Sequence, residues 1–156
     1  MCSEFTFRDT SDLRRANMRA IKSRRNKTTE KRLRAHIVAS GVSGWRMHSS
    51  ELSGCPDFFF YRARVAVFVD GCFWHGCPRC GHVPKTNRSY WLKKLKRNRQ
   101  RDERIGIALK LKGIRVLRIW ECDLRSQPLS CLKRILKLLE STLGVRKVAS
   151  RPRIST

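Results

Sequence analysis

Residues 68–80, FVDGCFWHGCPRC, constrain this chain more than any other segment. They continue an apolar run, Val65 to Val69, that reads as a buried strand. Close to the strand's end come a carboxylate, an imidazole, two thiols spaced C-x-x-C and two adjacent aromatic rings, namely Asp70, His75, Cys77, Cys80, Phe73 and Trp74. Active sites are commonly built where such side chains converge at the end of a rigid element. We therefore expect the functional site at this end of the strand.

The charge of the chain points to a polyanionic partner. Thirty-six Lys and Arg stand against twelve Asp and Glu, a formal charge of +24. Folding does not require this imbalance, and self-repulsion makes it costly. The basic residues are spread along the chain, which suggests several phosphate-facing surfaces. Nucleic acid is therefore favoured as the partner over an acidic protein or a membrane surface.

The cysteines point to metal binding or catalysis. No run approaches the roughly 18 apolar residues of a membrane span, and the N-terminus lacks the apolar region of a signal peptide. We therefore expect a cytosolic protein with reduced thiols, in which clustered cysteines indicate metal or catalysis before disulfides. Of the seven cysteines, four are interpreted as core or incidental thiols: Cys2, Cys55, Cys72 and Cys131.

Hydrophobic periodicity predicts one α/β domain. Helices are expected at 11–24, 29–40, 87–112 and 128–143, and strands at 45–48, 57–61, 64–70 and 114–120. Asn87 is expected to cap the long helix, and Gly113 to follow its end. This order predicts a mixed sheet with helices on its faces. Residues 11–144 would form the domain, residues 1–10 a leading segment and residues 145–156 a basic, disordered tail.

Some polar residues lie where the pattern predicts burial. In the long helix, steps of three and four place Asn98 and Asp102 on one face with Trp91, Leu95, Ile105 and Leu109. A buried Asp102 needs a metal, a cation or hydrogen-bond donors, and one of the many arginines would suffice. Glu30 projects with Leu33 and Ile37, although a helix dipole also favours a first-turn glutamate.

Two aspartates could form a divalent-metal site. Asp57 opens one predicted strand and Asp70 ends the next, so adjacent strands could bring them close together. Mg²⁺ is usually held by one or two carboxylates, water and substrate phosphate. The alternative is a pair of salt-bridged aspartates at the strand ends.

The thiols fit a zinc site or a redox pair. Cys77 and Cys80 need two further ligands for tetrahedral zinc. Cys122 is a natural third, and Asp102 or His82 could be the fourth. A redox C-x-x-C is disfavoured because no helix starts after Cys80 to lower a thiol pKa.

The residues around these thiols also allow more than one role. His75 can act as a general base, as a ligand or as a structural residue. Phe73 and Trp74 are either core or wedges that enter a base stack.

The chain resembles the very short patch repair endonucleases of bacterial T·G mismatch repair. The matching segments appear in family order over about residues 11–125: Asn17-Met-Arg-Ala-Ile21, Glu30-Lys-Arg-Leu33, Pro56-Asp-Phe58, Val67 to Cys77, Tyr90-Trp-Leu92, Asn98 with Arg101-Asp102, and Val116 to Cys122. The combination of G-C-F-W-H with a downstream W-E-C is highly specific. One departure from the implied fold is that no ExK follows Pro56-Asp57, and Asp70-Gly-Cys72 takes that place.

The resemblance implies a restriction-endonuclease-like PD-(D/E)xK fold and a Mg²⁺-dependent nick 5′ to the mispaired thymine. It implies that Asp57 holds Mg²⁺, aided by backbone or by Asp70, and that His75 activates water, oriented by Glu30. It also implies that Asn98 belongs to the catalytic set and that zinc is bound by Cys77, Cys80, Cys122 and Asp102. The residues implied to contact DNA are the wedges Phe73, Trp74 and Trp91 and a clamp of Asn17, Met18, Arg19 and Ile21.

The implied partners are T·G-mismatched duplex DNA, a cytosine-5 methyltransferase and mismatch-repair proteins. The protein would act as a cytoplasmic, nucleoid-associated monomer. Two rival interpretations are a zinc-containing DNA-binding protein without catalysis and a thiol oxidoreductase.

Overall fold

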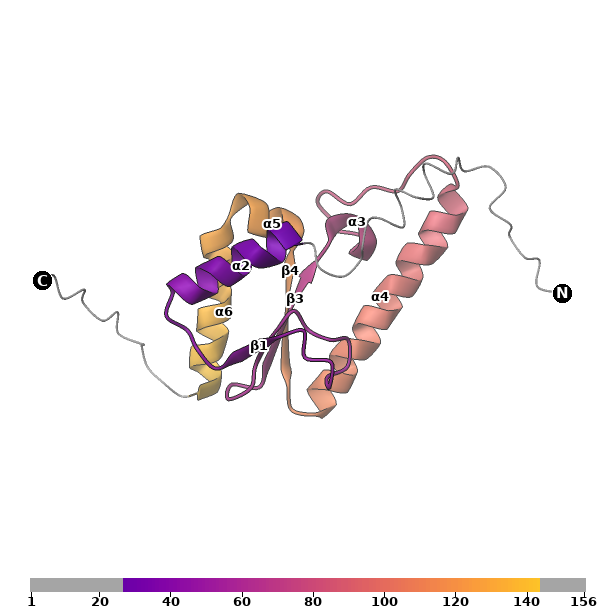
Figure 1. The fold of residues 1–156 in the computed structure, drawn as a ribbon. Helices are drawn as coiled ribbons and strands as arrows, with labels where there is room; N and C mark the ends of the chain where they lie inside the picture. Colours follow the sequence, from indigo (N-terminus) through magenta and orange to yellow (C-terminus); the bar gives the residue numbers. More distant parts are fainter. Residues whose placement is uncertain (1–26, 144–156) are drawn as a thin grey trace, which may run out of the picture.

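The computed structural model describes residues 27–143 (Figure 1). Its elements, in chain order, are α2 (Lys27–Ala39), β1 (Trp45–Met47), β2 (Phe58–Phe60), β3 (Val65–Asp70), α3 (Cys72–His75), α4 (Arg88–Leu111), β4 (Arg115–Trp120), α5 (Glu121–Ser126) and α6 (Pro128–Leu143). The expected helix at 11–24, the two terminal segments and the clamp residues Asn17, Met18, Arg19 and Ile21 lie outside the described residues.

The four strands form one mixed sheet in the order β1-β2-β3-β4. The pairs β1–β2 and β2–β3 are antiparallel, whereas β3 and β4 are parallel, with Phe68 opposite Arg118 and Asp70 opposite Trp120. Parallel neighbours need a long crossover, and α3 and α4 provide it. The expected mixed sheet flanked by helices is thereby confirmed.

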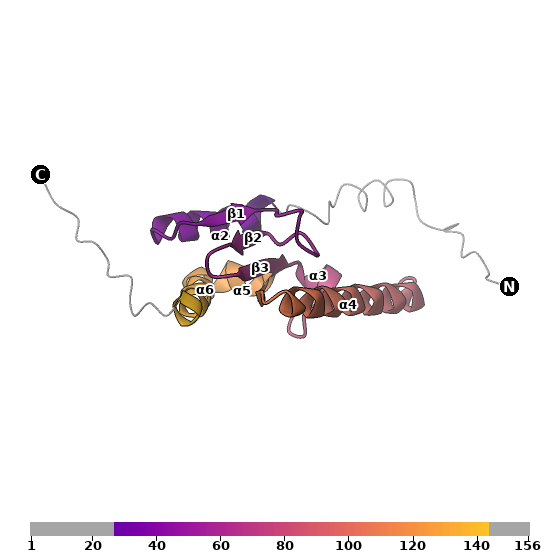
Figure 2. The ribbon, with the colours of Figure 1, turned by 90° about the horizontal axis from the view of Figure 1, so that it is seen from below.

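Alternation along β3 builds two cores on opposite faces of the sheet. Val65 and Val67 pack with α2, α5 and α6, whereas Ala66 and Phe68 pack with Leu109 of α4. Figures 1 and 2 show α2, α5 and α6 on one side of the strands and α4 on the other. Asp70 ends β3 on the face of Ala66 and Phe68, so it lies on the side of α4.

The expected strands and helices in this range match the structure to within two residues. Neither α3 nor α5 was expected, because elements of four and six residues show no clear period. Asn87 precedes α4 as expected, but its side chain makes no capping bond. Its backbone is left-handed, with φ of 54°, and not extended as in an ordinary N-cap. None of the described helices is long and apolar enough to cross a membrane.

Candidate active site

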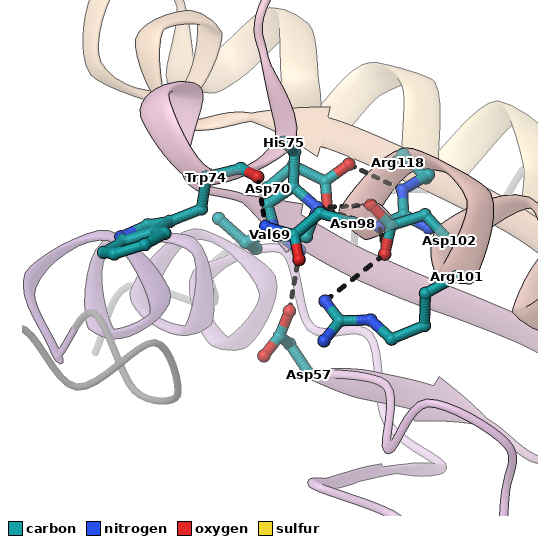
Figure 3. Close-up of polar contacts among 9 residues, drawn as sticks. All are labelled: Asp57, Val69, Asp70, Trp74, His75, Asn98, Arg101, Asp102 and Arg118. Carbon is teal, nitrogen blue, oxygen red and sulfur yellow. Dashed lines mark hydrogen bonds and ion pairs between the residues drawn. The ribbon is translucent and has the colours of Figure 1, made fainter. Parts of the chain in front are cut away.

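Four side chains meet where β3 ends: Asp70, His75, Asp102 and Arg118 (Figure 3). Asp70 is the last residue of β3, and the single turn of α3 carries His75 next to it. Asp102 comes from the inward stripe of α4, and Arg118 from β4. The face of the long helix on which periodicity placed Asp102 therefore meets the end of β3, where the sequence predicted the functional site.

His75 and Asp102 form the shortest contact of this group. Nδ1 of His75 lies 2.5 Å from Oδ2 of Asp102, and the two side chains are 18% and 13% exposed. An ionised carboxylate only accepts hydrogen bonds, so Nδ1 keeps its proton and Nδ1–H donates the hydrogen bond to Asp102. The other ring nitrogen, Nε2, then keeps a lone pair that can accept a proton. This arrangement is that of an oriented general base.

Arg118 binds both aspartates of the group. Its Nε lies 2.6 Å and its Nη2 2.8 Å from the two oxygens of Asp70, and Nη2 lies 3.2 Å from Oδ1 of Asp102. Burial acts to lower the pKa of Arg118, but the two carboxylates outweigh it and raise that pKa. Because Asp70 is 3% exposed and holds Arg118 with both oxygens, it serves as an ion-pair partner. The structure thus favours the salt-bridged alternative for Asp70 over the metal ligand.

Asn98 fixes the turn that carries His75. Its side-chain amide donates to the carbonyl of Trp74 at 2.8 Å (Figure 3). The carbonyl precedes His75 in the chain, so Asn98 links α4 to the backbone next to the base. Asn98 faces inward, as periodicity predicted, and its contact is that of a positioning residue.

A second group joins Glu30, His48 and Asp57. One ligand atom from each of these residues lies within 4.8 Å of the other two, and Oε2 of Glu30 is 3.4 Å from Nε2 of His48. Oδ2 of Asp57 accepts a hydrogen bond from the backbone of Val69 at 2.7 Å. This bond ties Asp57 to the end of β3, next to Asp70.

Asp57 is held in an environment that disfavours its charge. Burial raises its pKa to about 7, and the charges of Glu30 and Asp70 add to the rise, against the lowering by Val69 N–H and Arg118. Close carboxylates raise each other's pKa, and groups with such shifts are often found at functional sites. Glu30 contacts His48, and it is Asp102 that contacts Nδ1 of His75. Among the contacts of the described residues, the carboxylate closest to Nδ1 of His75 is thus that of Asp102, and the role expected for Glu30 stays a prediction.

A third group contains four thiols. Cys72, Cys77, Cys80 and Cys122 bring their sulfur atoms within 4.8 Å of one another. The sulfurs of Cys77 and Cys122 are 3.7 Å apart, far beyond a disulfide bond. Tetrahedral zinc with Zn–S bonds of 2.3 Å would separate its sulfurs by about 3.8 Å. The group therefore has the dimensions of a tetrahedral metal site.

The thiol group corrects the predicted ligand set. Asp102 contacts His75 and Arg118, and the fourth member of the thiol group is Cys72, interpreted from the sequence as incidental. Burial acts to raise the pKa of Cys77, but backbone N–H groups of Cys80 and Arg79 and the neighbouring thiols lower it to about 6. The thiolate is the form that binds metals.

Sequence comparisons connect these three groups to a family. A family model described as "DNA mismatch endonuclease Vsr" matches residues 8–80. The chain is 40% identical over 121 residues to "Type II nicking enzyme V.XorIIP" of Xanthomonas oryzae pv. oryzae, covering 76% of this chain and 87% of the relative. The chain belongs to the Vsr family.

Other Vsr relatives extend the match. The "DNA mismatch endonuclease Vsr" of Escherichia coli K12 is 40% identical over 116 residues, which is 73% of this chain and 72% of the relative. "Type II nicking enzyme V.NmeDIP" of Neisseria meningitidis serogroup C is 34% identical over 145 residues, 91% of this chain and 96% of the relative. The last match is long enough to include α4 and β4. Membership of the Vsr family makes this protein a DNA-cleaving hydrolase.

An aromatic cluster lies beside the Vsr site. Phe73 meets Trp74 and Trp91 with ring centroids 5.0 Å apart in each case, and Trp74 lies 6.2 Å from Trp91. All three rings are partly exposed. The structure thus gathers the three residues expected as wedges, between α3 and the start of α4.

Three site residues of this Vsr protein were missed from the sequence. Cys72 had a usable signal, since it lies five residues before Cys77 in a chain with several clustered cysteines. Arg118 also had one, an arginine between apolar neighbours on the face of Val116 and Trp120. For His48 the only signal was its position at a strand end.

Proposed function

We propose that this protein nicks duplex DNA 5′ to the thymine of a T·G mismatch, in very short patch repair of deaminated 5-methylcytosine. The observation that carries the proposal is the His75–Asp102 pair, which lies on the same strand end as the Asp57 carboxylate. A general base and a cation-binding group at one point are the parts that phosphodiester hydrolysis needs.

His75 takes the proton from the attacking water. Nε2 is the accepting atom because Nδ1 is bound to Asp102. Asp102 keeps the ring in this tautomer and stabilises the imidazolium once it forms, and Arg118 holds the second oxygen of Asp102 in place. General base catalysis of this kind contributes about 10²–10⁴-fold in rate.

Asp57 and Glu30 fit a divalent cation, for which the family resemblance implies Mg²⁺. Two carboxylates converge here, and Val69 N–H orients one of them. A bound cation would neutralise charge on the scissile phosphate and on the leaving 3′-oxygen. Pro56-Asp57 directly before β2 and the mixed sheet support a PD-(D/E)xK-type fold, with the backbone after β3 in place of the missing ExK.

Zinc on Cys72, Cys77, Cys80 and Cys122 would be structural. The four thiols join the segment after β3 to the start of α5. A closed tetrahedral site leaves no open position for substrate. Such a zinc would fix α3, and with it His75, relative to the sheet.

The basic residues and the aromatic cluster would have different roles in DNA binding. The basic residues, which give the chain its net charge of +24, would bind the phosphates of any duplex. Phe73, Trp74 and Trp91 would enter the base stack, where a T·G wobble pair resists unstacking less than a Watson–Crick pair does. Asn17, Met18, Arg19 and Ile21 would clamp the opposite groove, and the enzyme would act as a monomer beside a cytosine-5 methyltransferase and mismatch-repair proteins.

Single-turnover nicking of T·G, T·A and C·G duplexes, each with Mg²⁺ and with EDTA, tests the proposal. The base pair is placed in each of a panel of flanking sequences taken from methyltransferase recognition sites. We expect nicking of the T·G duplex only, and only with the cation. Trp91→Ala should reduce the preference for T·G, whereas Leu92→Ala, at an exposed neighbouring position of α4, should retain it. Binding without any cleavage would leave a non-catalytic DNA-binding protein as the better interpretation.

A further inference from the structure

The imidazole of His48 lies beside the two carboxylates of the proposed cation site. Glu30 comes from the first turn of α2, His48 directly follows β1, and Asp57 directly precedes β2. The backbone N–H of His48 donates to the carbonyl of Asp57 at 3.3 Å. The two segments are thus tied together at the point where their side chains converge.

The spacing of the three side chains suits a single ion. Ligands of one octahedral cation lie about 3 Å apart when adjacent and about 4.2 Å apart when opposite, since each sits about 2.1 Å from the ion. Nε2 of His48 is 3.4 Å from Oε2 of Glu30, and ligand atoms of all three residues fall within 4.8 Å of one another. Three donors from three segments therefore enclose a space of the right size.

The burial of the two carboxylates suits a bound cation. Glu30 is 7% exposed, and both His48 and Asp57 are partly buried. Two carboxylates brought this close together in a partly dry position repel each other. A divalent ion ligated by both carboxylates offsets this repulsion.

We propose that His48 is a direct nitrogen ligand of the catalytic cation and that the site consequently prefers Mn²⁺ to Mg²⁺. The proposal rests on the function proposed above, which places the cation at Asp57, and it deepens that function by naming the ligand set. Mg²⁺ takes oxygen ligands almost exclusively, while an imidazole adds affinity for divalent transition metals.

Calorimetric titration of the zinc-loaded full chain, without DNA, measures this preference. The wild type should bind Mn²⁺ about tenfold or more tightly than Mg²⁺. His48→Gln keeps a side-chain oxygen but loses the nitrogen, so Mn²⁺ affinity should fall about tenfold while Mg²⁺ affinity changes less than about threefold. His36→Gln, in the last turn of α2, is the matched control and should bind both ions as the wild type does.

Pulsed electron paramagnetic resonance of the Mn²⁺-bound protein reads the ligand directly. Coupling to ¹⁴N should appear in the wild type and in His75→Gln, and should vanish in His48→Gln. If the wild type shows no ¹⁴N coupling, the proposal is overturned, whether or not the variants fold. It is also overturned if His48→Gln binds Mn²⁺ and Mg²⁺ with the same affinities as the wild type. The T·G nicking assay is separate: a protein that shows the ¹⁴N coupling but does not nick contradicts the proposed function and not the ligand assignment.

Discussion

Nδ1 of His75 lies 2.5 Å from Oδ2 of Asp102, and this contact joins the turn after β3 to the inward face of α4. The two residues are 27 positions apart in the chain. Their pairing gives the inward carboxylate of α4 a function: it fixes which nitrogen of the imidazole is free. The proposed chemistry depends on this tautomer.

Replacing Asp102 by asparagine should slow nicking while the fold persists. The amide can present its NH₂ group to Nδ1 and so favour the tautomer in which Nε2 carries the proton. In a triad that uses the same pairing the equivalent change costs about 10⁴-fold in rate. We expect a loss of about 10²–10⁴-fold in single-turnover nicking. Glu103→Gln, next to it on the exposed side of α4, should nick normally. Equal rates for both variants would contradict the role of Asp102.

Removing Arg118 should destabilise the fold. Asp70 is 3% exposed and would be left as a buried charge without its partner. Breaking a buried ion pair in this way costs about 3–5 kcal/mol, so Arg118→Met should lower the free energy of unfolding by about that amount. Arg125→Met breaks an exposed pair with Glu121 and should cost less than about 1 kcal/mol. Urea denaturation measures both, and similar losses would argue against a buried pair.

Asp57 should make the metal-free protein less stable as pH rises. Its pKa is 3.8 as an ordinary aspartate and about 7 in the folded protein. Between these values the folded state holds the proton that the unfolded state has released, so this residue's contribution to stability declines from about pH 4 to pH 7. Asp57→Asn lacks this dependence. Its melting temperature should therefore rise relative to the wild type between pH 5 and pH 8, by a few degrees.

Thermal denaturation without added divalent metal is the measurement for Asp57. Glu51→Gln, an exposed carboxylate in the loop before β2, is the control and should show no such trend. A constant difference between Asp57→Asn and the wild type across this pH range would mean that Asp57 titrates normally.

Cys72 should be needed for the metal content of the protein. If zinc binds the four-thiol group, Cys72→Ser should reduce zinc below one per chain and lower the melting temperature, because zinc binding is coupled to folding. Cys55→Ser, a thiol outside the group, should retain one zinc. Metal analysis of both purified variants measures this. A full complement of zinc in Cys72→Ser would mean that Cys72 is not a zinc ligand.

The sequence predicted the strands and long helices because alternation and the helical period report which side of an element is buried. For the same reason it placed Asn98 and Asp102 on the inward face of α4. Periodicity does not report which partner an inward side chain meets, so the choice for Asp102 between a metal, an arginine and other hydrogen-bond donors stayed open. In the structure Asp102 contacts both His75 and Arg118, and these contacts depend on how α4 packs against the ends of β3 and β4.

The four-residue helix α3 and the contact between His48 and Glu30 could not be predicted from the sequence. The single turn of α3 decides that Cys72 points to the other thiols and that His75 points to Asp102, and four residues show no period. His48 meets Glu30 only because β1 ends beside the first turn of α2. Both arrangements depend on packing between segments that are separate in the chain.

The most direct test of the account maps the cut on a duplex with one T·G pair, labelled on either strand at either end. With a divalent cation, the wild type should give one product, a nick on the thymine strand immediately 5′ to the mispaired thymine, and His75→Ala should bind the duplex without cutting it. Cutting of both strands, equal cutting of a matched C·G duplex, or undiminished nicking by His75→Ala would contradict it.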